Sequence, residues 1–145
     1  MIRRADVNDI DIICYICNSP GLTPQGDSDG HLYSEWFELL LNNKNRDKVL
    51  FYVHEDKNGT VDGFILGEPL LCDGVKLWMV GVSPKITGRG VGVRLLKYFE
   101  NQCMNRGFEW INTEGFVDTI PIDKSTKMGY QTNGKRYCSY FKSLV

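Results

Sequence analysis

Apolar residues in this chain recur at two spacings, every second position in some segments and every third or fourth position in others. The first spacing predicts strands, and the second predicts amphipathic helices. The predicted strands cover 1–4, 48–56, 61–71, 75–82, 108–115, 130–132 and 135–145, and the predicted helices cover 6–17, 31–41, 91–106 and 118–129. A loop rich in Gly, Pro and Asp, over 18–30, separates the first two helices.

The order of these elements predicts the fold class. Turns at Asn58-Gly59 and Asn133-Gly134 join neighbouring strands as hairpins, and the helix over 91–106 connects one strand to the next. We therefore expect an α/β (α+β) protein with a mixed, mostly antiparallel central sheet and helices on both of its faces. No repeat or linker divides the sequence, so residues 1–145 are expected to form a single domain.

The same spacing predicts which helix positions are buried. Asp6 is expected to cap the first helix, with Asp9 in its first turn. The predicted buried face of the second helix holds Leu32, Trp36, Leu39 and Leu40. In the helix over 91–106 the predicted apolar stripe is Val91, Leu95, Leu96, Phe99 and Cys103, and the predicted outward residues are Arg94, Lys97, Glu100 and Asn101.

Composition narrows the class of protein. The chain has 145 residues, 42% of them hydrophobic and 24% charged, as is typical of a globular domain. Its net charge of −1 does not predict a nucleic-acid surface. We expect no association with a membrane, because no apolar run reaches the roughly 18 residues that would span one. The start of the chain turns polar too early for a signal peptide.

Cysteine usage adds an expectation about the compartment. There are five cysteines, and Cys14 and Cys17 form a C-x-x-C on the predicted apolar face of the first helix, beside Ile10 and Ile13. No second pair and no nearby His completes a zinc set, so we expect core thiols and no metal, with a redox or metal-binding pair as the alternative. Free thiols favour a reducing, cytoplasmic compartment.

Three glycines, Gly88, Gly90 and Gly92, stand at the start of the helix predicted over 91–106. A helix N-terminus presents unpaired N–H groups and a partial positive charge, and glycines let an anion approach the backbone. The spacing does not match the dinucleotide fingerprint G-x-G-x-x-G, since Val93 occupies the third position, and no lysine completes a P-loop. The alternative is that the glycines serve only tight helix packing.

Three segments resemble motifs of one family. The stretch "VSPKITGRGVGVRLLKYFE" resembles the acetyl-CoA signature of the GCN5-related N-acetyltransferases, with Gly90 and Gly92 on its two small positions. "DTIPIDKSTKMGY" is similar to the late motif of that family, with Asp118, Lys127, Gly129 and Tyr130 on matching positions, and "IRRADVND" resembles its first strand and helix cap. The resemblance extends along the whole chain and implies the acyl-CoA N-acyltransferase fold.

The resemblance implies acetyl-CoA as cosubstrate, with its pyrophosphate on the N–H groups of residues 88–93 and its pantetheine beside the fourth strand, over residues 80–82. Two positions depart from the family pattern. Thr87 replaces the usual Arg or Gln, and Ser125 replaces a frequent Tyr that can protonate the leaving thiolate. The implied cofactor-binding residues are Val80, Gly81, Val82, Thr87, Gly88, Arg89, Gly90, Val91, Gly92, Val93, Asp118 and Lys127.

The implied reaction is transfer of an acetyl group to a primary amine by direct attack in a ternary complex. An ammonium group with a pKa near 10.4 must lose a proton before it attacks, so a base is needed. Glu114, at the end of the fifth strand, is the best candidate, with a solvated strand-end carboxylate as its alternative, and Ser125 is placed beside the leaving group. Glu109 and His31 are weaker candidates, and His54 is expected on a surface or sheet face.

The acceptor is expected to meet the first loop, the second helix and the last hairpin. These segments supply acidic and aromatic residues that suit a cationic group, with Asp29, Tyr33, Trp36 and Tyr137 as the predicted contacts and Asp27, Glu35 and Tyr140 nearby. Alternatively, Trp36 is a core residue and "GDSDG" a solvated turn. A small-molecule amine and a peptide amine both remain open.

Two other functions remain open: a non-catalytic acyl-CoA-binding regulatory module, suggested by Thr87 and Ser125, and a toxin or regulator that acts with a protein partner. An exposed last strand would also allow a homodimer.

Overall fold

The computed structural model describes residues 1–18, 31–86, 88–116, 129–132 and 137–145. The predicted helix over 118–129 and the turn at Asn133-Gly134 lie outside these residues. The elements are β1 (Ile2–Arg4), α1 (Ile10–Cys17), α2 (His31–Leu41), β2 (Leu50–Glu55), β3 (Val61–Pro69), β4 (Gly74–Val82), α3 (Val91–Asn105), β5 (Trp110–Phe116), β6 (Gln131–Thr132) and β7 (Tyr137–Ser143). Each of these elements was predicted, and the bounds differ by a few residues.

The described strands form one seven-stranded sheet in the order β1-β2-β3-β4-β5-β7-β6. β4 and β5 run parallel, and the other neighbouring strands run antiparallel. The predicted mixed, mostly antiparallel sheet is therefore confirmed. β7 lies between β5 and β6, and the two-residue β6 forms that edge of the described sheet.

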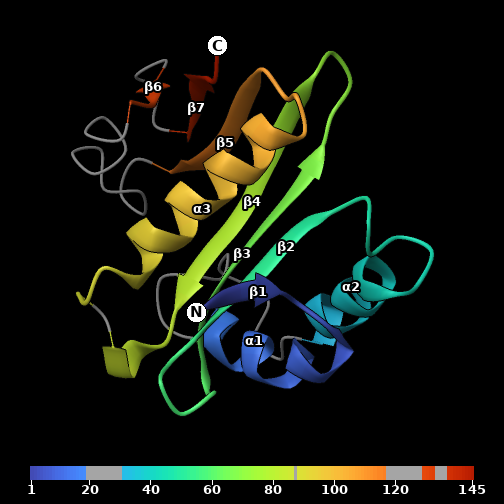
Figure 1. The fold of residues 1–145 in the computed structure, drawn as a ribbon, viewed down its shortest axis with the longest axis vertical. Helices are drawn as coiled ribbons and strands as arrows, with labels where there is room; N and C mark the ends of the chain where they lie inside the picture. The colour runs from blue at the N-terminus through green and yellow to red at the C-terminus, as the bar shows by residue number, and fades with distance from the viewer. Residues whose placement is uncertain (19–30, 87, 117–128, 133–136) are drawn as a thin grey trace.

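Helices cover both faces of the sheet, as predicted. Alternate side chains of β2 and β3 point to opposite faces because a strand has a period of two. Phe51 and Phe64 pack with α1 and α2, whereas Tyr52 and Ile65 pack with α3. Figure 1 shows α3 lying along the middle strands and α1 with α2 near β1 and β2. No helix within the described ranges has the length and apolar character of a membrane span.

The first turn after β1 is fixed by the predicted cap. Asp6 accepts the Asn8 N–H at 2.8 Å, and the Asp6 N–H donates to the Asp9 carboxylate at 2.9 Å, which completes a capping box. Arg3 donates two hydrogen bonds to Asp9, at 2.8 and 2.9 Å. Burial is the largest single influence on Asp9 and raises its pKa, but the Arg3 hydrogen bonds, the Asp6 backbone N–H and the nearby positive charges together hold the pKa below its ordinary value.

Cys17 and Cys103 are core thiols, as predicted. Burial raises the pKa of each to about 12, which keeps them in the unreactive thiol form at neutral pH. Cys14 is only half-buried, and burial raises its pKa too. The C-x-x-C spacing is therefore accounted for by helix packing.

Glycines in β3 let α3 lie close to the sheet. A Cβ on Gly67 would stand 2.6 Å from Phe99 Cε2, and one on Gly63 would stand 3.0 Å from both Leu95 Cδ1 and Val91 Cγ1. The distance at Gly67 is too short for any side chain, whereas a side chain at Gly63 would require Leu95 and Val91 to shift. The apolar stripe of α3 therefore packs directly on the backbone of β3.

The predicted buried face of α2 is partly wrong. Leu39 is 62% exposed, whereas Phe37, Leu40 and Leu41 are buried. Phe37 and Leu41 are one helical turn apart, and Leu39 lies on the opposite side of that turn. The Leu32 side chain lies outside the part of the structure that is described.

The prediction for the outward face of α3 is wrong at Glu100, which is 7% exposed. Its carboxylate accepts the Tyr130 hydroxyl at 3.2 Å and the Lys142 ammonium at 2.8 Å. Burial raises the pKa of Tyr130, and the neighbouring carboxylate raises it further. The buried Glu100 carboxylate therefore links three parts of the chain: α3, the residue just before β6, and β7.

Glu100→Leu should lower the free energy of unfolding by about 2 to 3 kcal/mol, because it removes the buried ion pair to Lys142 and the acceptor of the Tyr130 hydroxyl. Glu100→Gln keeps one acceptor for the hydroxyl and should cost less. Urea denaturation measures both, with the exposed neighbour Asn101→Leu as control. Equal stability of Glu100→Leu and Asn101→Leu would contradict a structural role for the buried charge.

Candidate functional site

β4 and β5 pair over only three residues each. Gly74–Lys76 lies opposite Trp110–Asn112, but β4 continues to Val82 and β5 to Phe116. The far parts of the two strands stay bound to β3 and β7 respectively. Beyond Lys76, the edge of β4 that faces β5 therefore has no strand partner among the described residues. We call this opening between the two strands the splay.

A β-bulge lies where the splay begins. Leu66 pairs with Met79 and Gly67 with Leu77, so Trp78 is the extra residue of β4. A bulge bends its strand and increases its twist. It turns Trp78 toward α2, where the indole lies 5.7 Å from the Trp36 ring, edge to face. Trp78 remains 45% exposed.

Tyr33, Trp36 and Trp78 form what we call the aromatic wall, on the α2 face of the sheet beside the splay. Tyr33 and Trp36 have ring centroids 6.4 Å apart, and the Lys76 ammonium lies 4.4 Å from the centre of the Trp78 ring. Trp36 is half-buried and also packs on the core, so the core interpretation is right for part of its surface.

The structure thus joins two predicted acceptor residues to Trp78, which sequence reasoning missed. A large aromatic in the middle of "KLWMVG" was a signal that could have identified it.

The glycine turn, residues 88–92, connects β4 to α3. Gly88 has φ 86° and Gly90 has φ 80°, in the left-handed region that favours glycine. A Cβ on either residue would have nothing within 4 Å, so tight packing does not account for them. Gly90 is the N-cap of α3 and has no side chain with which to make a capping hydrogen bond. Within the described residues, the first N–H groups of α3 are therefore left without a capping side chain.

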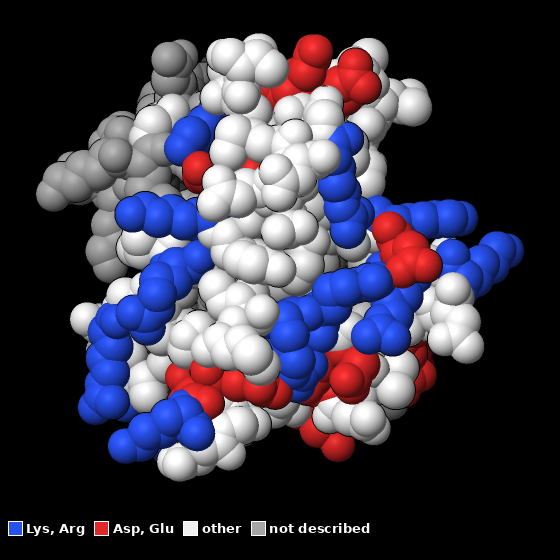
Figure 2. Space-filling model, viewed as in Figure 1, with Lys and Arg blue, Asp and Glu red and all other residues white. Residues whose placement is uncertain are grey.

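Positive charge gathers near this helix end. Figure 2 shows basic side chains over the glycine turn and the start of α3, at the lower left of the view. Lys85, Arg89 and Arg94 are exposed in this part of the chain. Their field adds to the partial positive charge of the helix N-terminus, so an anion is attracted to this end of α3.

The predicted cofactor residues fall into three groups. Val80 and Val82 are half-buried on the α3 face, and Arg89 and Val93 are exposed at the turn and on α3. Gly81 and Val91 belong to the core. A Cβ on Gly81 would stand 2.5 Å from Phe64 Cε1, so the packing leaves no room for a side chain there, and the Val91 side chain is buried. Thr87, Asp118 and Lys127 lie outside the described residues.

Only some of the predicted catalytic residues and predicted acceptor contacts lie within the described residues. Glu114 lies in β5 beyond the segment paired with β4, opposite Ser139 of β7. Tyr137 and Tyr140 follow on β7, opposite Phe116 and Thr113, across β5 from the splay. Ser125, Asp27 and Asp29 lie outside the described residues.

The weaker candidates lie elsewhere. Glu109 is exposed and immediately precedes β5. It therefore lies next to the residues where β4 and β5 are still paired, away from the opening between them. His31 begins α2. His54 lies in β2 and pairs with Asp62 at 2.5 Å, as a partly buried sheet-face residue. No described group of His, Cys, Asp and Glu side chains has the arrangement of a metal site.

Solved structures with this fold include several acetyltransferases. PaiA N-acetyltransferase from Thermoplasma acidophilum, in complex with coenzyme A, is 14% identical with a TM-score of 0.80 and covers 99% of this chain and 98% of its own. The yncA protein from Salmonella typhimurium, solved with its cofactor acetyl-CoA, is 20% identical with a TM-score of 0.76, over 100% of this chain and 94% of its own.

The ribosomal-protein-S18-alanine N-acetyltransferase from Escherichia coli is 14% identical with a TM-score of 0.77, over 99% of this chain and 93% of its own. At these identities the likeness establishes the fold alone. No curated protein sequence matches this chain. The family model for the acetyltransferase (GNAT) family matches residues 12–121. With the splay, the glycine turn and this match together, the chain belongs to the GNAT acetyltransferase family.

Proposed function

We propose that the protein is an N-acetyltransferase that transfers an acetyl group from acetyl-CoA to a primary amine by direct attack in a ternary complex. The observation that carries this proposal is the splay between β4 and β5, which leads to the uncapped N-terminus of α3. The relatives solved with coenzyme A or acetyl-CoA support the choice of cosubstrate.

The residues present fit acetyl-CoA. The open positions at Gly88 and Gly90 leave room for a pyrophosphate to reach the N–H groups of α3, and Arg89 adds a charge where Thr87 supplies none. The free edge of β4 over residues 80–82 offers backbone groups to the amides of pantetheine, as an added strand would use them. When bound, acetyl-CoA supplies a thioester carbon for the amine to attack.

The acceptor approaches from the other face of the sheet. The glycine turn leads into α3 on one face, whereas the aromatic wall lies with α2 on the opposite face. The splay is where ligands on the two faces can meet. Exposed aromatic rings bind ammonium groups over their faces, which suits a protonated amine waiting for deprotonation. Both a small molecule and a peptide terminus satisfy this requirement.

Removal of a proton from the amine is the largest single chemical demand. A lysine-like amine with pKa near 10.4 costs about 4 to 5 kcal/mol to deprotonate at pH 7, whereas release of a thiolate whose acid has pKa near 8.5 costs about 2 kcal/mol. Glu114, in the part of β5 beyond the paired segment, is the proposed base. Ser125 is proposed to donate a hydrogen bond to the leaving sulfur, directly or through water.

Gly90→Val should abolish CoA binding while the protein still folds. Gly107, just past the other end of α3, has φ 83° and an equally open Cβ position, so Gly107→Val is a matched control. Each left-handed valine should cost about 1 to 2 kcal/mol of stability, but only Gly90→Val places a branched side chain over the N–H groups. Calorimetric titration with CoA decides: wild-type affinity in folded Gly90→Val would contradict the proposed phosphate position.

CoA should raise the melting temperature more than pantetheine, which lacks phosphate. At 100 times its dissociation constant, a ligand that binds only the native state adds about 2.7 kcal/mol. Pantetheine at the same concentration should shift melting much less, because the helix terminus attracts phosphate. Equal shifts in melting temperature from the two compounds would show that the glycine turn does not bind phosphate.

Glu114→Gln should lower turnover more than Ser125→Ala and move the pH optimum upward, because the amine must then lose its proton to solvent. Ser125→Ala should lower turnover by less than about tenfold, since thiolate release is the smaller cost. Free-thiol release from acetyl-CoA, followed against pH with one good amine, measures both. A loss beyond about a hundredfold in Ser125→Ala with near-normal Glu114→Gln would reverse the two roles.

The same assay distinguishes the enzyme from an acyl-CoA-binding regulatory module. Turnover with any amine excludes a binding-only protein. Tight CoA binding with no thiol release across a broad amine panel would favour the regulatory module.

A further inference from the structure

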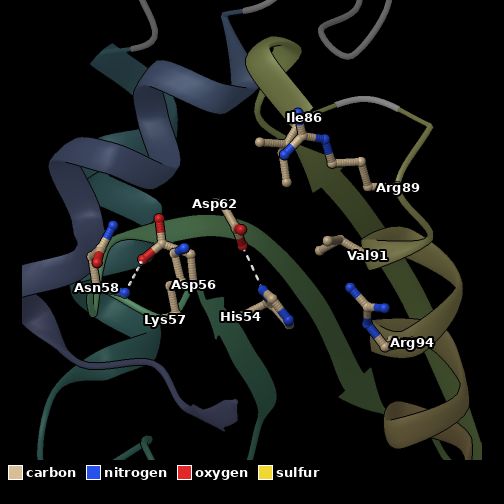
Figure 3. A pocket seen from close by; sticks show the side chains of 9 residues that line it. All are labelled: His54, Asp56, Lys57, Asn58, Asp62, Ile86, Arg89, Val91 and Arg94. Carbon is tan, nitrogen blue, oxygen red and sulfur yellow. Dashed lines mark hydrogen bonds and ion pairs between the residues drawn. The ribbon is translucent and has the colours of Figure 1, made fainter.

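A second hollow lies between the β2–β3 hairpin and the start of α3. Its volume is about 370 Å³. Figure 3 shows side chains from both sides pointing toward it. It lies on the β2 and β3 side of the glycine turn, whereas the splay lies on the β5 side. We call it the hairpin pocket, and its ionisable lining residues are His54, Asp56, Lys57, Asp62, Arg89 and Arg94.

His54 is held in one orientation. Its Nδ1 lies 2.5 Å from the Asp62 carboxylate, and the two side chains are 12% and 11% exposed. Asp62 is the extra residue at the register shift between β2 and β3, which accounts for its position beside His54. With Nδ1–H donated to Asp62, the second ring nitrogen points away from Asp62, toward the side where Arg94 lies (Figure 3).

The carboxylates of the hairpin pocket are already engaged. Asp56 accepts the N–H groups of Asn58 at 2.8 Å and Thr60 at 3.0 Å, and Asp62 is bound to His54. In contrast, Lys57, Arg89 and Arg94 make no hydrogen bond or ion pair to any other described side chain. Three cations face two carboxylates, for a net charge of +1 that becomes +2 when His54 is protonated.

We propose that the hairpin pocket binds a phosphate monoester dianion. Arg94 and Arg89 offer guanidinium forks that match phosphate oxygens, and Lys57 adds a point charge. The second ring nitrogen of His54 is a further polar group on the side where Arg94 lies (Figure 3). Asp62, Asp56, Lys57, Arg89 and Arg94 are the charged groups that face His54 in the pocket.

Because Arg89 also belongs to the glycine turn, an occupant of the hairpin pocket would restrain the loop that begins α3. The phosphate monoester has two candidate sources, the 3′-phosphate of CoA itself and a separate phosphorylated metabolite. The chemistry of the pocket is the same for both, and CoA variants distinguish them.

Sulfate is the probe for the first experiment because it carries the same double negative charge as a phosphate monoester dianion. Calorimetric titration of sulfate into the wild-type protein at neutral pH should show saturable binding. Arg94→Gln should weaken sulfate binding about tenfold, as expected for loss of a charged hydrogen bond. Lys97→Gln removes an exposed cation one turn along α3, outside the pocket, and should leave binding unchanged.

Lys57→Gln removes another cation of the pocket and should also weaken sulfate binding, so it decides the proposal if Arg94→Gln does not fold. Gly90→Val tests the competing location, the N-terminus of α3. Sulfate binding that is lost in Gly90→Val but kept in Arg94→Gln would overturn the proposal, as would equal binding by Arg94→Gln, Lys97→Gln and wild type.

CoA and 3′-dephospho-CoA identify the source of the phosphate. If Arg94→Gln weakens CoA but not 3′-dephospho-CoA, the pocket holds the 3′-phosphate. If Arg94→Gln weakens sulfate alone, a separate phosphate ester is the occupant. Either result supports the pocket, and neither depends on amine turnover, so the proposed acetyl transfer stands or fails separately.

Discussion

The short pairing between β4 and β5 is the constraint on which the site depends. A parallel pair usually continues as long as both strands do, because each unpaired backbone group loses a hydrogen bond. Here the pair ends after Lys76 and Asn112, and beyond them neither strand has a strand partner on that side among the described residues. The outer neighbours, β3 and β7, hold the two strands in place. The free backbone edge is therefore stable without a strand, and a ligand with amide groups can complete it.

The bulge at Trp78 changes the side chains that β4 presents on one face of the sheet but not on the other. On the α3 face, Leu77 and Val80 keep β4 in the core under α3. On the α2 face, the extra residue presents an indole beside Trp36 that a regular strand would have directed elsewhere. One inserted residue thus changes the surface on one side of the sheet and leaves the packing on the other side intact.

The sequence was sufficient to predict most of the fold, because strand and helix periodicities are local properties. The glycine turn was also predictable, since its residues are adjacent in the chain. Glu100 was placed wrongly because its partners, Tyr130 and Lys142, are 30 and 42 residues away and neither is implied by helix spacing. The splay, the bulge at Trp78 and the pairing of His54 with Asp62 depend on register between strands, which spacing along one strand does not reveal.

The absence of side chains at Gly63 and Gly67 has a consequence for anion binding at the N-terminus of α3. The helix rests on the backbone of β3, so its direction is fixed by contacts with little freedom to adjust. A rigid helix aims its first N–H groups before any anion arrives, and binding then loses little conformational entropy. Selection for anion affinity would consequently act on the middle of β3, at two residues that no ligand touches.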